Sequence, residues 1–189
     1  MRRVKFIIPL IIICVLILMV MPIDENAESN FSQYNIELEQ IKGDNQLSYS
    51  KYPRFEDEAW KIGVNPYSDA YLFGQCTWFA WARFYEIYGY SPGFLGNGYE
   101  CASQLVNCHR DLFTLSDTPV VGSIGSSDYE HNHVWIVVGV DENGCTIQEG
   151  NLDGITNEFI DSLTDWRQAY YTYEQLKKKY GDVIFANPI

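Results

Sequence analysis

The longest apolar stretch of the chain lies at its beginning. Residues 6–23 are apolar, broken only by two prolines, and they follow the basic start Met1–Lys5. Such a stretch is close to the roughly 17–25 residues that span a bilayer and longer than the about 7–15 of a signal-peptide core. No Ala-x-Ala cleavage site follows it. We predict that residues 1–23 are a signal peptide or an uncleaved membrane anchor, and that the rest is exported.

Residues 24–64 change to a polar pattern rich in Glu, Asn, Ser and Gln. This composition is typical of a linker, which has too little apolar surface to fold alone. Four aromatic residues leave a second interpretation open, an arm packed on the domain that follows. They are Tyr49, Tyr52, Phe55 and Trp60. We expect the compact domain over residues 65–189.

Helical periodicity is clearest at residues 76–88. Trp78, Trp81 and Tyr85 recur at helical spacing, and they form an apolar stripe that we expect to face the core. Gly89 is expected to end this helix, because glycine tolerates the left-handed conformation of a helix cap.

The second half of the chain has the shorter apolar runs of a sheet. Strands are expected at residues 119–124, 133–140, 145–151 and 183–185, and further helices at 100–108 and 173–180. A helical part followed by strands joined through tight turns is the α+β pattern. We therefore predict an N-terminal helix packed on an antiparallel sheet.

The turn after the strongest strand sets the register of the predicted hairpin. The sequence Asp-Glu-Asn-Gly at 141–144 is typical of such a turn. A two-residue turn at Asn-Gly would place Glu149 opposite Val138, about 17 Å along the strand from His133. Bringing Glu149 to His133 requires a longer or bulged hairpin loop instead.

Charge excludes one class of function. The chain has 13 Lys and Arg against 25 Asp and Glu, a net charge of −12. Such a surface repels nucleic acid and anionic lipid, so we set nucleic-acid binding aside. An apolar content of 47% is sufficient for a packed core.

Cys76 begins the aromatic helix. A cysteine there lies near the positive end of the helix macrodipole and near backbone N–H groups that have no helical partner. This setting favours a thiolate nucleophile and supplies donors for an oxyanion. The alternative is a structural cysteine, since free cysteines are among the most buried residues.

A cysteine nucleophile needs a base and a group that orients the base. His133 opens the strongest strand, and strand alternation puts it on one face with Trp135. Glu149 and Asn151 share a face of the return strand, and both residue types accept an imidazole N–H. The alternative is that these are solvated polar residues at strand ends and in loops.

Five short motifs follow one another in a recognisable order. They are Gly74-Gln-Cys-Thr-Trp78, Gly96-Asn-Gly98, Pro119-Val-Val-Gly-Ser-Ile124, His133-Val-Trp-Ile-Val137 and Ile147-Gln-Glu-Gly-Asn151. The series resembles the CHAP domain, the cysteine- and histidine-dependent amidohydrolase/peptidase family of bacterial cell-wall hydrolases. The resemblance covers residues 65–189, and it is most specific around the cysteine and the histidine.

The resemblance implies a papain-like α+β fold, similar to NlpC/P60 proteins, and cleavage of amide bonds in peptidoglycan. It implies Cys76 as nucleophile, His133 as base, and Glu149 and Asn151 as orienting groups, without deciding which of these two touches His133. Oxyanion donors would be the Cys76 backbone N–H and Gln75. We expect a monomer that acts on peptidoglycan without a cofactor.

Two positions depart from the family pattern. Asn132 replaces a glycine before His133, and Trp135 replaces a small residue two places after it. Because Trp135 shares a face with His133, we predict that it lines the substrate groove. The alternative is that it packs in the core under the Cys76 helix. An alternative function is an inactive surface-binding module whose groove Trp135 blocks.

Cys101 and Cys108 are predicted to form a disulfide, because an exported chain meets an oxidising compartment and the two residues flank a short segment. Together with His109, His131 and His133 they also suggest a zinc site. Their spacing does not match that of common zinc sites, so we prefer the disulfide and predict no metal.

Overall fold

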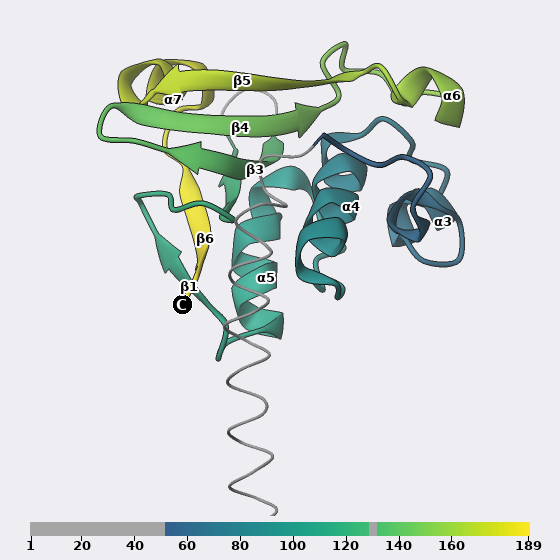
Figure 1. The fold of residues 1–189 in the computed structure, drawn as a ribbon, viewed down its shortest axis with the longest axis horizontal. Helices are drawn as coiled ribbons and strands as arrows, with labels where there is room; N and C mark the ends of the chain where they lie inside the picture. The colour runs from purple at the N-terminus through teal and green to yellow at the C-terminus, as the bar shows by residue number, and fades with distance from the viewer. Residues whose placement is uncertain (1–51, 129–131) are drawn as a thin grey trace, which may run out of the picture. The chain divides into compact units, whose positions relative to one another are not determined.

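In residues 52–128 and 132–189, which the computed structural model describes, six strands form one antiparallel sheet (Figure 1). The strands lie in the order β1-β6-β2-β3-β4-β5. Their bounds are Phe113–Ser116 (β1), Ile124–Ser127 (β2), His133–Val140 (β3), Gly144–Gly150 (β4), Trp166–Thr172 (β5) and Ile184–Pro188 (β6). The helices are η1 (Glu58–Trp60), α3 (Pro66–Asp69), α4 (Cys76–Tyr88), η2 (Gly98–Glu100), α5 (Cys101–Cys108), α6 (Phe159–Ser162) and α7 (Tyr173–Tyr180).

Helix α4 packs on one face of the sheet and α7 covers part of the other. Val134 and Ile136 of β3 belong to the core around α4, whereas Val137 packs with residues of α7. Alternation along β3 therefore divides the core in two. The predicted α+β class, with the cysteine-bearing helix packed on an antiparallel sheet in a papain-like arrangement, is confirmed.

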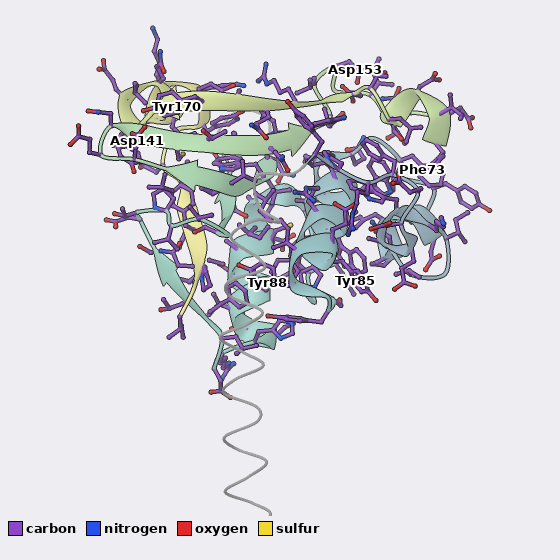
Figure 2. The ribbon with its side chains drawn as sticks, viewed as in Figure 1. Phe73, Tyr85, Tyr88, Asp141, Asp153 and Tyr170 are labelled. Carbon is purple, nitrogen blue, oxygen red and sulfur yellow. The ribbon has the colours of Figure 1, made fainter. Side chains whose placement is uncertain are left out.

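The turn between β3 and β4 lies one residue earlier than predicted. The backbone N–H of Asp141 donates to the Gly144 carbonyl, so the two residues between them, Glu142 and Asn143, form the turn. The Asp141 carboxylate holds it by accepting the N–H groups of Asn143 at 2.8 Å and Gly144 at 2.9 Å. Figure 2 shows Asp141 and Tyr170 at one end of the β4–β5 pair and Asp153 beyond the other.

A bulge in β3 shifts the register further. It lies between Val137 and Gly139, and beyond it Ile136 is opposite Gln148. Glu149 is the next residue after Gln148, so it falls about 7 Å from His133 along the strand, instead of about 17 Å. The prediction of a two-residue Asn-Gly turn was wrong, and the predicted alternative of a longer or bulged loop was only partly right, because the loop keeps two residues and the bulge lies within β3.

The first predicted strand is displaced. Residues 119–124 were expected to be extended, but the strand β2 begins only at Ile124. Before it, the Ser123 hydroxyl accepts the Val120 N–H at 2.9 Å, and Gly122 has a φ of 93°. These features close a turn where the apolar pattern predicted a strand.

Residues 55–60 are part of the folded domain. Trp60 is fully buried, and its ring centroid lies 4.5 Å from that of Phe55. Its indole N–H donates to Glu86 of α4 at 2.7 Å, and the N–H of Arg54 donates to the same oxygen at 2.8 Å. Glu86 also pairs with the buried Arg83. For this segment the packed-arm interpretation is correct, and the linker interpretation is wrong.

Trp135 is a core residue. Its indole is fully buried against α7, with its centroid 4.5 Å from the Tyr180 ring. Gly125 of β2 lies opposite, where a Cβ would approach the indole to 2.5 Å, so this glycine makes room for the tryptophan. Trp135 does share a face with His133, but the prediction that it lines the groove is wrong because α7 covers that face. The core interpretation named α4 as the covering helix, which also needs correction.

The predicted disulfide is absent, because Cys101 and Cys108 are free thiols. They are the first and last residues of α5. A rise of about 1.5 Å per residue separates their Cα atoms by about 10 Å, beyond the roughly 7 Å that a disulfide can bridge. The disulfide prediction supposed that this segment could close on itself, which the helix also predicted at residues 100–108 prevents.

Predictions for residues 1–23 and 24–51 fall outside the described residues. Within the described ranges, no helix has the length and apolar character needed to cross a membrane.

Candidate functional site

Cys76 is the first residue of α4. The chain enters the helix through Gly74, with a φ of 79°, and the extended Gln75. A Cβ on Gly74 would lie 2.9 Å from the side chain of Asn157, so glycine suits this position on two grounds. The Cys76 sulfur is 3.9 Å from the carbonyl oxygen of Asn132, the residue before β3. The start of the helix therefore lies beside the start of the strand.

His133 links the cysteine to a carboxylate. Its Nε2 lies 2.8 Å from Glu149 Oε2 of the neighbouring strand. Cys76 also acts on the imidazole, since it is among the groups that raise the pKa of His133. Since Nε2 contacts Glu149, Nδ1 is the ring nitrogen left to exchange a proton with Cys76. The structure thus brings together three of the residues predicted from the sequence.

Glu149 is buried and surrounded by donors. Its Oε2 also accepts the Tyr180 hydroxyl at 2.5 Å. Its Oε1 lies 2.8 Å from Arg167 Nε and 3.5 Å from Lys179 Nζ. A buried carboxylate stays ionised only when such partners offset its loss of hydration, so this cluster keeps Glu149 charged.

The pKa values of the pair follow from these contacts. Burial alone would lower the pKa of His133, but hydrogen bonds and charge interactions with Cys76 and Glu149 raise it to about 9. Burial would raise the pKa of Glu149, but His133, Tyr180 and Lys179 lower it to about 2. Near neutral pH the site therefore holds an imidazolium against a carboxylate.

Asn151 has a different partner from the one predicted. It adopts a φ of 63°, and its Nδ2 lies 3.4 Å from the side-chain oxygen of Gln75. The Gln75 amide nitrogen in turn donates to the Thr156 hydroxyl at 2.8 Å. Of the two predicted orienting groups, Glu149 contacts His133, and Asn151 helps to hold Gln75 beside Cys76.

Two depressions meet at Asn151. One, of about 470 Å³, is lined by Cys76, Gln75 and the 95–98 loop. The other, of about 400 Å³, is lined by His133, Glu149 and the cations of β5 and α7. Because Asn151 lines both, the depressions adjoin at this residue, and we call the two together the groove, with the cysteine on one side and the histidine on the other.

Asn132 explains one departure from the family pattern. Its φ of 50° is a left-handed conformation, which glycine adopts most easily and asparagine tolerates better than most residues. Its side chain accepts the Tyr99 N–H at 2.8 Å. The 96–98 loop packs so closely that a Cβ on Gly98 would lie 2.7 Å from the Asn132 carbonyl. The substitution therefore preserves the backbone that places His133.

The sequence analysis did not identify the three residues that surround the Glu149 carboxylate. Arg167, Lys179 and Tyr180 come from β5 and from the end of α7. The only local signal was the predicted helix at 173–180, whose end carries Lys179 and Tyr180. Nothing in that helix indicates which strand it packs against.

The residues of the rejected zinc site are dispersed. His109 Nε2 contacts the Ser91 carbonyl at 2.8 Å, and Cys101 and Cys108 lie at opposite ends of α5. His131 lies outside the described residues. In residues 52–128 and 132–189, no group of three or more His, Cys, Asp or Glu side chains could hold a metal ion.

A helix-borne cysteine beside a histidine and a carboxylate of an antiparallel sheet is a papain-like α+β arrangement. Residues 66–151 match the model of the CHAP domain family. All five motifs lie within the matched residues, so the resemblance to this family that they predicted is confirmed for this part of the chain.

Two solved structures resemble the chain at low identity. A crystal structure of N-acetylmuramoyl-L-alanine amidase from Staphylococcus aureus has 19% identity and a TM-score of 0.45. It aligns over 74% of this chain, which spans only 38% of that one. The crystal structure of Ly7917 has 20% identity and a TM-score of 0.39, over 61% of this chain and 53% of that one. No curated protein matches the chain.

Proposed function

We propose that this protein is a peptidoglycan hydrolase that cleaves an amide bond, as amidase or endopeptidase, with Cys76 as nucleophile. The observation that carries the proposal is that His133 contacts Glu149 at 2.8 Å and interacts with Cys76, and that two adjoining depressions are lined by the cysteine and by the histidine. The CHAP family match over residues 66–151 supports it. The substrate is inferred from the family and from the name of the amidase that the fold resembles.

In the proposed reaction the reactive form is a thiolate–imidazolium pair, in which the Cys76 proton already resides on His133, and the thiolate sulfur attacks the amide carbonyl carbon. The carbonyl π electrons move to oxygen, and the oxyanion accepts hydrogen bonds from the Cys76 backbone N–H and the Gln75 side-chain amide. The C–N bond then breaks, His133 protonates the departing amine, and the acyl group stays on sulfur as a thioester. Water, deprotonated by His133, attacks this thioester and releases the acid and the thiol.

Glu149 and Asn151 act indirectly, by positioning His133 and Gln75. Glu149 orients the imidazole by accepting its Nε2–H, and it stabilises the imidazolium form. Asn151 holds Gln75 so that the amide of Gln75 stays next to the reacting sulfur. We assign Asn151 to positioning rather than to the proton relay.

The alternative function, an inactive surface-binding module, is not supported by the position of Trp135. It required Trp135 to block the groove, and Trp135 is buried in the core. The lining of the groove instead includes both Cys76 and His133, which a pure binding module does not need.

Dye release from labelled, purified peptidoglycan tests the proposal. Cys76→Ala should lower the rate by about 10⁴-fold with an unchanged unfolding temperature, and His133→Ala should behave alike. His131→Ala is expected to change the rate of dye release only slightly. Cys108→Ala, which removes an exposed thiol of α5, is the matched control and should leave the rate unchanged. A Cys76→Ala variant that still releases dye would contradict the proposal.

Action on the cell wall also requires export. We propose that residues 1–23 direct it, as a cleaved signal or an anchor. Fractionation of the producing cells and mass measurement of the mature N-terminus would distinguish the two. Mass spectrometry of the released wall fragments would identify the bond that is cut.

A further inference from the structure

Arg167 and Lys179 line the depression on the His133 side of the groove, which has a volume of about 400 Å³. Both approach Glu149 Oε1, at 2.8 Å for Arg167 Nε and 3.5 Å for Lys179 Nζ. Two cations thus share one carboxylate oxygen. Their side chains are 42% and 38% exposed, so both remain within reach of a ligand in the depression.

The known contacts use only part of the donor capacity of these cations. A guanidinium has about five N–H donors and an ammonium about three. Glu149 takes the Nε–H of Arg167, and the Tyr171 hydroxyl lies 2.9 Å from Lys179 Nζ. Lys179 Nζ also lies over the rings of Tyr171 and Tyr180, at 5.0 and 4.7 Å from their centroids. Both side chains line the depression and are partly exposed, and such donors pair favourably with a carboxylate.

The proposed chemistry decides which part of the substrate lies there. His133 protonates the departing amine, so the amine leaves toward His133. The fragment that carries this amine therefore extends into the depression beyond His133. The acyl fragment stays on Cys76 and occupies the neighbouring depression.

We propose that Arg167 and Lys179 form a subsite for a carboxylate carried by the amine-side fragment of the substrate. The orientation of that fragment rests on the proposed function, whereas the affinity for a carboxylate rests on the two cations alone. Peptide stems carry such carboxylates at their ends and side chains, so the subsite selects wall fragments in which this group is free.

Local charge supports a carboxylate ligand. Asp153 also lines the depression, but its carboxylate accepts the Ile155 N–H at 2.9 Å and is held by its own loop. Together with the His133 imidazolium, the charges of Arg167 and Lys179 exceed those of Glu149 and Asp153 by one, whereas the whole chain carries −12. An anion that enters this depression therefore meets a small excess of positive charge on an otherwise acidic protein.

Calorimetric titration of the Cys76→Ala protein, which binds without hydrolysis, tests the subsite. The probes are the dipeptide Ala-Ala and its C-terminal amide. The acid should bind about tenfold more tightly than the amide, the difference expected for one charge-assisted hydrogen-bonded contact. Lys179→Gln and Arg167→Gln, each added to Cys76→Ala, should remove this preference.

Lys177→Gln is the matched control. Lys177 belongs to the same helix, but its side chain is 76% exposed and pairs with Asp182. This variant should keep the tenfold preference. Equal binding of acid and amide, binding of neither, or a preference that survives both substitutions would overturn the subsite. Dye release by the unmodified protein is measured separately, so a failure of the proposed function is distinguishable from a failure of the subsite.

Discussion

The ring of Tyr180 lies parallel to the imidazole of His133, with an angle of 3° between their planes and 5.6 Å between their centroids. The same tyrosine donates its hydroxyl to Glu149 Oε2, the oxygen that also contacts His133 Nε2. One residue of α7 therefore contacts both members of the histidine–carboxylate pair. Its ring limits the tilt of the imidazole and its hydroxyl fixes the carboxylate.

Tyr180 should therefore act as a positioning residue. Tyr180→Phe keeps the ring and removes the hydroxyl, and we expect kcat to fall about tenfold with KM unchanged. Tyr180→Leu also removes the stacked ring and should lower kcat further. Steady-state kinetics on a soluble wall fragment would show this split. Equal kcat values for the Phe variant and the parent protein would contradict the role of the hydroxyl.

Glu149 should set the alkaline limit of activity. The pKa of His133 is raised to about 9, and the carboxylate of Glu149 is one of the causes, because it stabilises the imidazolium. In Glu149→Gln this stabilisation is lost, so the pKa of His133 should fall toward its ordinary value of 6.5. The alkaline limb of the pH profile of kcat/KM should move to lower pH, with a lower maximum. An unmoved limb would show that another group controls it.

The same pair should make stability depend on pH. The raised pKa of His133 contributes stability that is complete below 6.5 and is lost as the pH rises through about 9. The lowered pKa of Glu149 contributes stability that is complete above 4.5 and is lost as the pH falls through about 2. Both contributions are complete only between these ordinary values. Urea unfolding below, within and above this window should show the maximum inside it, and Glu149→Gln should flatten the curve.

Trp135 should matter for stability rather than for substrate choice. Because its indole is fully buried under α7, Trp135→Ala should cost about 3–5 kcal/mol of unfolding free energy. Ile160→Ala, at a position 72% exposed, is the control and should change stability by less than about 0.5 kcal/mol. Thermal unfolding measures both. A small loss of stability with an altered substrate preference would restore the groove interpretation.

Trp60 should be as important to the fold as residues inside the family match. Its burial and its hydrogen bond to Glu86 predict a loss of about 3–5 kcal/mol in Trp60→Ala. Tyr52→Ala provides the comparison from the same segment, because Tyr52 is largely exposed. Urea unfolding of the two variants would show whether the arm belongs to the cooperative unit. Similar midpoints for both would contradict it.

The local sequence pattern was sufficient to predict the helix and the strand that hold Cys76 and His133. The spacing of Trp78, Trp81 and Tyr85 predicted α4, and Gly89 ends it with a φ of 76°. The continuous apolar run after His133 predicted β3. These features could be predicted because helix and strand periodicity and turn chemistry depend on residues near one another in the chain.

Contacts between distant parts of the chain decided the rest. A bulge beside Val138 and a turn one residue early brought Glu149 to His133, and neither has a sequence signature of its own. The placement of α7 buried Trp135 and delivered Tyr180 and Lys179 to Glu149. Sequence alone determined which side chains could react. Tertiary packing decided which of them meet, because strand register and the face that a helix covers depend on burial summed over the whole core.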